Sequence, residues 1–117
     1  MARKKPILLP LSGVSDASGD LTLKTKPMGA GGLLCVQLIS VRNDDTASCL
    51  AHIGVERAGL VSYLETILMT TAGYTYPYYH PIWVPSDYRV VVKFASAGNK
   101  KACYAVVFGY LDPSGEG

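Results

Sequence analysis

Apolar residues recur along the chain in short runs that alternate with polar positions, and turn-forming residues separate the runs. The run at 21–27 (LTLKTKP) alternates leucine with threonine or lysine, which is the two-residue period of a half-buried β-strand. The run at 33–42 (LLCVQLISVR) carries apolar residues on both faces of a strand. Both runs predict β-strands, and the second predicts a strand that is covered on both sides.

Two hairpins are predicted from neighbouring runs. The turn formers at 43–46 (NDDT) separate the run at 33–42 from a returning apolar run (ASCLAHIGV), and the loop SAGNK separates 88–95 (YRVVVKFA) from 101–111 (KACYAVVFGYL). Alternation assigns one face of the last strand to Tyr104, Val106, Phe108 and Tyr110. In the run at 33–42, one face holds Leu34, Val36 and Leu38, and the other holds Cys35, Ile39 and Val41.

The run at 60–69 (LVSYLETILM) is ambiguous, because its leucines also fit a helical spacing, and we favour a strand. Roughly six to eight short strands without a clear amphipathic helix predict an all-β fold, a single antiparallel β-sandwich or jelly-roll-like domain. The sandwich is expected to span 21–111, with an extended N-terminal arm at 1–20 and a polar C-terminal tail at 112–117.

The predicted arm combines a basic start, two prolines and the polar segment SGVSDASGD, so it has little of its own to bury. We expect it to become ordered only against another surface. Its basic residues either keep a disordered end soluble or steer the arm to an acidic partner before the apolar residues dock. The candidate contact residues are Arg3, Lys4, Lys5, Ile7, Leu8, Leu9 and Leu11.

Composition points to a surface that is hidden in an assembly. Hydrophobic residues make up 49% of the 117 residues and charged residues only 17%, against about 25% charged in an average soluble domain. The net charge is +2, and three of the positive charges lie in the predicted arm, so the remaining body is nearly neutral. Without a basic stripe that could neutralise phosphates, nucleic acid is not an expected partner.

The three cysteines, Cys35, Cys49 and Cys103, are widely spaced and lie in apolar runs. They predict buried thiols of a protein made in a reducing cytoplasm, not a disulfide framework or a zinc site. The apolar run at 7–11 is too short for a signal-peptide core, and no run approaches the roughly 18 apolar residues of a membrane span. Neither secretion nor a membrane partner is expected.

The segment 74–85 (YTYPYYHPIWVP) concentrates aromatic residues and prolines. Tyr and Trp offer large contact areas with few rotatable bonds, and proline stiffens the chain further. Three interpretations remain open: a loop packed on its own sandwich, a protein–protein contact, and a stacking platform for sugar rings. The candidate contact residues are Tyr74, Tyr76, Tyr78, Tyr79 and Trp83.

Candidate catalytic and ligand-binding groups are few. His52 lies inside a predicted strand, and His80 lies in the aromatic segment, where Asp87 is its nearest candidate partner. The glycine-rich MGAGGLL lacks the pattern of a phosphate-binding loop, and the adjacent Asp44 and Asp45 fit a turn better than a calcium site. We therefore expect a protein that is not an enzyme and has no cofactor and no metal.

The order of elements from residue 33 onward resembles that of small virion proteins of tailed bacteriophages. The similar elements are a strand that ends in a turn (LISVRNDDTAS), the segment AHIGVERAG, a proline-flanked HPIWVPSDYRVVVKF and a closing YAVVFGYL. The resemblance covers about 80 residues as a pattern and includes no diagnostic motif. It implies a noncatalytic β-sandwich that attaches to the major capsid protein or to neck or tail proteins. Capsid decoration proteins of this kind often assemble as trimers, with terminal arms that reach neighbouring subunits.

These observations together lead us to expect a capsid decoration, or cement, protein that is made in the host cytoplasm and located in the virion. A first alternative is an adaptor or ring component at the neck or tail. A second alternative, from another class, is a carbohydrate-binding module whose tyrosines stack on sugars.

Overall fold

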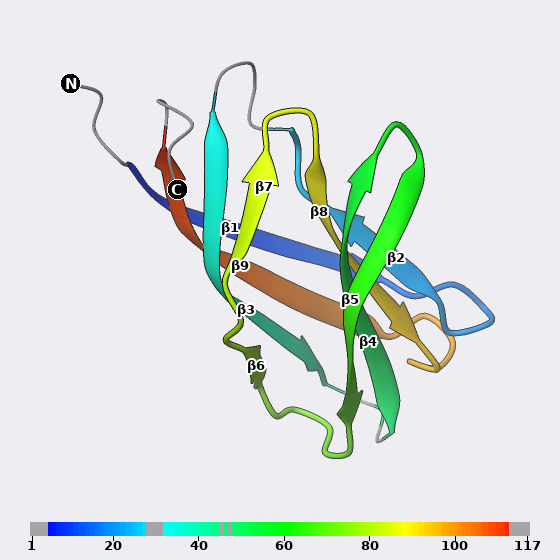
Figure 1. Cartoon of the computed structure of the whole chain (residues 1–117). Helices are drawn as coiled ribbons and strands as arrows, with labels where there is room; N and C mark the ends of the chain where they lie inside the picture. Colours follow the sequence, from blue (N-terminus) through cyan, green and yellow to red (C-terminus); the bar gives the residue numbers. More distant parts are fainter. Residues whose placement is uncertain (1–4, 28–31, 45, 47, 113–117) are drawn as a thin grey trace.

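The computed structural model describes residues 5–27, 32–44, 46 and 48–112, and in these residues every regular element is a β-strand. The strands form two antiparallel sheets that pack face to face (Figure 1). In spatial order, sheet A consists of β1 (Lys5–Val14), β9 (Ala102–Asp112), β3 (Leu33–Asn43) and an edge shared by β6 (Tyr76–Tyr78) and β7 (Ile82–Pro85). Sheet B consists of β2 (Leu21–Lys24), β8 (Arg89–Ala95), β4 (Cys49–Arg57) and β5 (Leu60–Met69).

The chain changes sheets at every connection except those from β4 to β5 and from β6 to β7. Because β6 and β7 occupy one edge, each sheet has four strand positions, which is the double-sheet arrangement of a jelly roll. The predicted all-β sandwich is therefore confirmed, as is the strand at 60–69.

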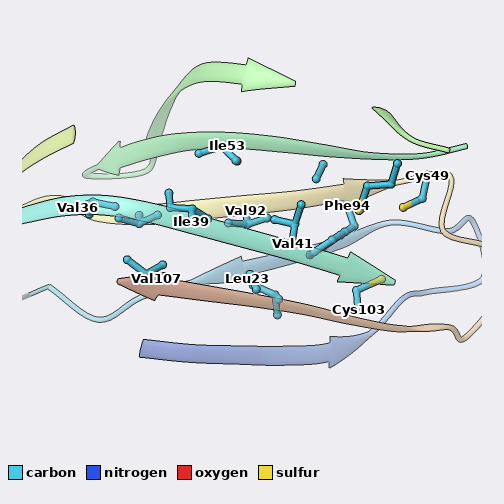
Figure 2. Close-up of a cluster of buried hydrophobic side chains, with 14 of the residues drawn as sticks. Leu23, Val36, Ile39, Val41, Cys49, Ile53, Val92, Phe94, Cys103 and Val107 are labelled. Carbon is cyan, nitrogen blue, oxygen red and sulfur yellow. The ribbon is translucent and has the colours of Figure 1, made fainter. Parts of the chain in front are cut away.

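The core lies between the two sheets (Figure 2). Sheet B contributes Ile53, Val92 and Phe94, which are fully buried, and sheet A contributes Ile39 and Val107. This packing explains the alternation in β8, where Val90, Val92 and Phe94 point inward. Burial of such side chains stabilises the fold by about 1.5–3 kcal/mol each.

The three cysteines are buried and free, which confirms the expectation of buried thiols. Cys49 on sheet B and Cys103 on sheet A both belong to the core (Figure 2). A hydrogen bond from the Cys103 thiol lowers the pKa of Cys49, while burial opposes this shift.

Both predicted hairpins are wrong. Strands β3 and β4 lie in different sheets, and so do β8 and β9. The loops between them cross the end of the sandwich, where Thr46 Oγ1 donates to the Ala97 carbonyl and the Ala97 amide donates to the Gly19 carbonyl at 3.0 Å. Local turn chemistry favours a reversal of the chain but does not decide whether the returning strand pairs with its predecessor or packs on top of it.

The true hairpin joins β4 and β5 through Ala58 and Gly59, both of which have positive φ (51° and 82°). Two consecutive residues of positive φ make the type I′ turn that suits the twist of paired strands. Alanine is an unfavourable residue for this conformation, so the dipeptide gave no clear turn signal in the sequence.

A β-bulge at Gln37 corrects the predicted faces of β3. The register between β3 and β9 shifts between Val36 and Leu38, so alternation changes phase there. Leu34, Val36, Ile39 and Val41 consequently share the core face, whereas Leu38 points outward. Gly109 of β9 passes the bulge so closely that a Cβ would overlap the carbonyl oxygen of Cys35.

The prediction of a free N-terminal arm is also wrong for its described part. The segment is extended, but β1 pairs with β9 over its whole length as an edge strand of sheet A. Ile7, Leu9 and Leu11 pack against the chain's own core, and Leu8 between them points outward. Lys5 is exposed, and Arg3 and Lys4 lie outside the described residues. Three of the segment's four apolar contact candidates, Ile7, Leu9 and Leu11, thus pack within the same molecule.

The polar end of the predicted arm is a turn between β1 and β2. The Asp16 carboxylate accepts hydrogen bonds from the amides of Asp20 (3.0 Å) and Ser18 (2.9 Å), and from the Ser18 hydroxyl (2.7 Å). The bond from the Asp20 amide is the largest influence, and together these bonds lower the pKa of Asp16. At the other end of the chain, Asp112 of the predicted tail is buried as the last residue of β9, and 113–117 lie outside the described residues.

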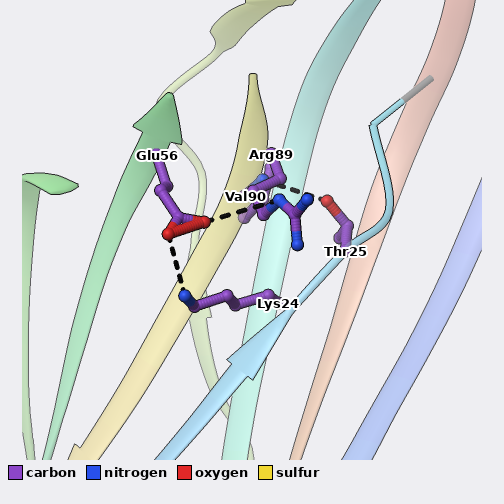
Figure 3. Close-up of polar contacts among 5 residues, drawn as sticks. All are labelled: Lys24, Thr25, Glu56, Arg89 and Val90. Atoms are coloured by element: carbon purple, nitrogen blue, oxygen red, sulfur yellow. Dashed lines mark hydrogen bonds and ion pairs between the residues drawn. The ribbon is translucent and has the colours of Figure 1, made fainter. Parts of the chain in front are cut away.

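On the outer face of sheet B, a buried carboxylate connects three strands (Figure 3). Glu56 of β4 lies 2.8 Å from Lys24 Nζ of β2 and 3.4 Å from Arg89 Nε of β8. Beside this cluster, the Val90 amide donates to Thr25 Oγ1 at 3.0 Å, and the Thr25 amide donates to the Val90 carbonyl at 3.0 Å. The charges of Glu56, Lys24 and Arg89 are thus paired within the molecule.

Candidate functional site: an apolar outer face on sheet A

The aromatic segment forms the edge of sheet A, and strand pairing decides where its side chains point. Tyr76 and Tyr78 of β6 pair with Val41 and Ile39, which face the core. Cross-strand partners share a face of the sheet, so both tyrosines point inward and pack against the core. Two of the five predicted contact residues are therefore largely structural.

Tyr76 is also fixed at its hydroxyl. The amide of Thr71 donates to the Tyr76 hydroxyl at 2.9 Å, and the Thr70 hydroxyl lies 3.3 Å from it. The bond with the Thr70 side chain is the main reason that the pKa of Tyr76 is lowered. The Tyr74 ring packs edge-on against Tyr76, with 5.3 Å between the ring centroids. The inward tyrosines thus anchor the segment and orient its exposed neighbours.

The other three predicted contact residues are exposed: Tyr74 by 61%, Tyr79 by 68% and Trp83 by 55%. Trp83 pairs with Cys35 in β3 and lies on the face of sheet A that points away from the core. Part of the segment therefore packs on its own sandwich, as one of the three interpretations predicts, and part of it is exposed.

Trp83 is one member of a larger apolar surface, which we call the outer face of sheet A. Leu8 (58% exposed) of β1 pairs with Phe108 (41% exposed) of β9, and Phe108 pairs with Leu38 of β3. The rows on either side are Pro6, Tyr110, Cys35 and Trp83, and Pro10, Val106, Ser40 and Pro77. These three rows contain no charged residue.

The outer face is rigid as well as apolar. Its central strands, β9 and β3, are paired on both sides, and a hydrogen bond with Cys35 raises the pKa of Tyr110 within one of its rows. Phe108 and Tyr110 belong to the side of β9 that alternation had grouped correctly. The exposure of this side of β9 was not predicted, because strand periodicity does not tell which of two apolar faces meets the second sheet.

A hollow of about 230 Å³ borders this face, lined by Ser40, Val41, Arg42, Thr75, Tyr104 and Val106. The Arg42 guanidinium carbon lies 4.8 Å from the centroid of the Tyr104 ring, and Arg42 Nε lies 3.0 Å from Asp44 Oδ1. The ion pair is poorly aligned for a hydrogen bond, so Arg42 Nε retains its donor capacity. Asp44 thus forms an ion pair with Arg42.

His52 lies in β4, and His80 lies between β6 and β7. Each makes contacts within the molecule. His52 Nδ1 lies 2.8 Å from the Thr66 hydroxyl, and its ring packs against Tyr63. The His80 ring packs against Tyr78 at 5.2 Å between centroids. Asp87, the predicted partner of His80, pairs instead with Arg57 at 2.9 Å.

Within the described ranges, no three His, Cys, Asp or Glu side chains come together in a group that could hold a metal ion. The same residues include no helix with the length and hydropathy needed to cross a membrane. No protein-family model matches the sequence, and a search of curated proteins finds no significant relative.

Proposed function

We propose that this chain is a noncatalytic structural subunit of a tailed-bacteriophage particle, where it binds the assembled capsid as a decoration, or cement, protein. The outer face of sheet A is the observation that supports this proposal. Leu8, Phe108 and Trp83 expose large apolar surfaces there within rows that contain no charge. A large uncharged apolar face marks an interaction surface, and a partner protein is one class of molecule that covers such a surface.

The chemistry of this face is that of an interface with a partner protein such as a major capsid protein. Interface centres are enriched in Tyr, Trp, Phe and Arg and depleted of other charges. Here Trp83, Phe108 and Tyr110 lie on the same face of one sheet, and Arg42 lies at its margin. Because paired strands hold these side chains, they lose little conformational freedom on binding.

Such a subunit stabilises a shell by mass action. A protein that binds the assembled shell, and not its dissociated parts, lowers the free energy of the assembled state by its own binding free energy. Many symmetric copies multiply the effect, so modest affinity at each site is enough. The jelly-roll fold is compatible with this proposal but is not evidence for it, because jelly rolls also occur in lectins and cupins.

The proposal is tested by placing a charge at the centre of the outer face. Trp83→Asp and Phe108→Asp are expected to weaken binding of the purified protein to particles that lack it by at least tenfold, because a buried unpaired carboxylate is strongly unfavourable. Thr22→Asp is the matched control, since Thr22 is exposed on the outer face of sheet B. Co-sedimentation with particles measures the bound fraction of each variant, and circular dichroism verifies that all three fold.

Binding that all three variants retain would place the contact elsewhere on the molecule. Equal loss in all three would indicate a general effect of added negative charge. Either result removes the outer face of sheet A from the proposed interface.

A carbohydrate-binding module is the second candidate, and the exposed rings of Trp83 and Tyr79 favour it. Exposed aromatic rings also serve as stacking platforms for sugars. A glycan array separates the two functions: binding to glycans that Trp83→Ala abolishes would support the carbohydrate function, whereas the capsid function predicts no glycan binding.

A further inference from the structure

Two of the three cysteines face each other across the core from opposite sheets. Cys49 is the first residue of β4 in sheet B, and Cys103 is the second residue of β9 in sheet A. Both side chains are fully buried and belong to the core. Figure 2 shows them at the same end of the core, with their sulfur atoms directed into the space between the sheets.

Direct contacts join the two sheets at this level. A hydrogen bond links the thiols of Cys103 and Cys49. The Asn43 amide nitrogen, Nδ2, lies 4.0 Å from Met69 Sδ. Asn43 is the β3 partner of Cys103, and Met69 is the β5 partner of Cys49, so the two cross-sheet contacts lie side by side. The sheets thus approach each other closely where the two sulfur atoms meet.

We propose that Cys49 and Cys103 form an intramolecular disulfide when the protein meets a small oxidant such as hydrogen peroxide, and that this bond covalently joins the two sheets. Both residues are thiols in the structure, which therefore describes the reduced form. The oxidised form has lost two hydrogen atoms and gained one S–S bond of about 2.05 Å. Because the two thiols are already in hydrogen-bond contact, the sulfur atoms need only a short further approach.

The reaction has two steps, and Cys49 reacts first. The hydrogen bond from the Cys103 thiol lowers the pKa of Cys49, although burial opposes this shift. The Cys49 thiolate attacks one oxygen of the peroxide, which gives a sulfenic acid and a hydroxide ion that takes up the proton released by Cys49. The Cys103 sulfur then attacks the Cys49 sulfur and displaces the hydroxyl group, which leaves as water with the proton of the Cys103 thiol. In total, two thiols and one peroxide become one disulfide and two water molecules.

The position of both thiols near strand ends gives a small oxidant access to them. Strand ends open locally at a much lower free energy than the middle of a sheet. Ser48, directly before Cys49, has a positive φ of 62°, which is an unfavourable conformation for a residue other than glycine. Hydrogen peroxide is little larger than a water molecule, so a brief opening of these ends admits it.

Cys35 is placed where it cannot take part in this bond. It pairs with Tyr110 and Trp83 in a row on the outer face of sheet A, so its side chain points away from the core. Its thiol is hydrogen-bonded with Tyr110. Among the possible pairings of the three cysteines, the fold therefore selects Cys49 with Cys103, and Cys35 serves as an internal control.

The bond is expected to stabilise the domain. A disulfide reduces the conformational entropy of the unfolded chain, and its effect grows with the length of the loop that it closes. This loop extends from β4 to β9. The bond itself concerns the chain alone, whereas its consequence for a virion rests on the proposed function: a subunit made in a reducing cytoplasm gains the bond after release into an oxidising medium.

Oxidation of the purified natural chain tests the proposal. The folded protein is treated with hydrogen peroxide and then unfolded, and its remaining thiols are labelled with a maleimide. We expect three labels per chain before oxidation and one afterwards, on Cys35, without a covalent dimer. Mass spectrometry of proteolytic peptides locates the bond. The midpoint of thermal unfolding is expected to rise by about 10 °C on oxidation and to return after reduction with dithiothreitol.

Three cysteine-to-alanine variants give the matched comparison. Cys35→Ala is expected to keep both the disulfide and the rise in midpoint, whereas Cys49→Ala and Cys103→Ala lose both. Circular dichroism shows whether each variant is folded. The measurement on the natural chain needs no variant, so it decides whether the bond forms even where an alanine variant does not fold.

Several results would overturn the proposal. Thiols of Cys49 and Cys103 that stay reduced in the presence of peroxide would show that the two strands hold them too far apart for a bond. Oxidation of Cys49 to a sulfinic acid without a disulfide would also count against it. A bond to Cys35, a bond between two chains, or an oxidised chain whose thermal midpoint does not rise would contradict a stabilising link between the sheets.

Discussion

Gly109 shows how one residue makes a bulge possible. It lies in β9 next to the bulge of β3, and its missing Cβ leaves room for the Cys35 carbonyl oxygen. The bulge then brings Ile39 and Val41 to the core face of β3. The phase of the apolar pattern in β3 therefore depends on a glycine in a different strand.

Gly109→Ala is expected to destabilise the fold by about 3 kcal/mol, because the added methyl group meets backbone atoms that cannot move independently. Chemical denaturation measures the loss. Gly13→Ala is the control, since its Cβ meets only the side-chain ends of Leu21 and Leu23, which can shift. Similar stability of Gly109→Ala and the natural chain would contradict the close approach at the bulge.

The direction of single side chains was predictable from the sequence where a strand is regular. Val90, Val92 and Phe94 alternate without interruption, and all three lie in the core. The prediction failed in β3, because no residue near Gln37 signals the bulge. Tyr76 and Tyr78 were predicted as contacts from residue type alone, and their inward direction follows from pairing with β3, which a local pattern does not contain.

Substitutions in β1 distinguish a free arm from an integral edge strand of the sandwich. Leu9 packs against the core, and its neighbour Leu8 points to the outer face. Leu9→Ala is expected to destabilise the domain by about 2 kcal/mol, whereas Leu8→Ala changes its stability by less than about 0.5 kcal/mol. Thermal or chemical denaturation of the two variants gives the comparison. If both substitutions were neutral, β1 would be a free arm and not part of the sandwich.

At the scale of elements, the sequence predicts the existence of strands much better than their pairing. The runs that become β2, β3, β4, β5, β8 and β9 were all recognised, because alternation and β-branched residues are local properties. Their assignment to sheets depends on contacts between residues far apart in the chain, such as Thr46 with Ala97. Both hairpins were mispredicted for this reason, and the β4–β5 turn escaped notice because Ala58 is an unusual residue in it.

At the scale of the whole molecule, the outer faces of the two sheets differ in where their charged groups lie. Sheet B carries the Glu56 ion pairs on its outer face, and sheet A carries the apolar rows around Phe108. The low fraction of charged residues predicted a surface hidden in an assembly, but it could not locate that surface. The position of the apolar rows follows from the two-sheet arrangement, which brings β1, β9, β3 and β7 together from both ends of the sequence.

The difference between the outer faces of the two sheets indicates which surface would be covered in an assembly. We propose that the outer face of sheet A binds the particle. This contact would bury aromatic and proline side chains.

The copy number of this chain in purified particles tests the central claim most directly. Quantitative mass spectrometry of phage particles, calibrated against the major capsid protein, gives this number. The capsid-decoration proposal predicts copies at about the number of capsid sites, on the order of hundreds per particle, because the stabilisation acts at repeated symmetric positions. About six or twelve copies would move the protein to the neck or tail, and its absence from intact particles would contradict a structural role in the virion.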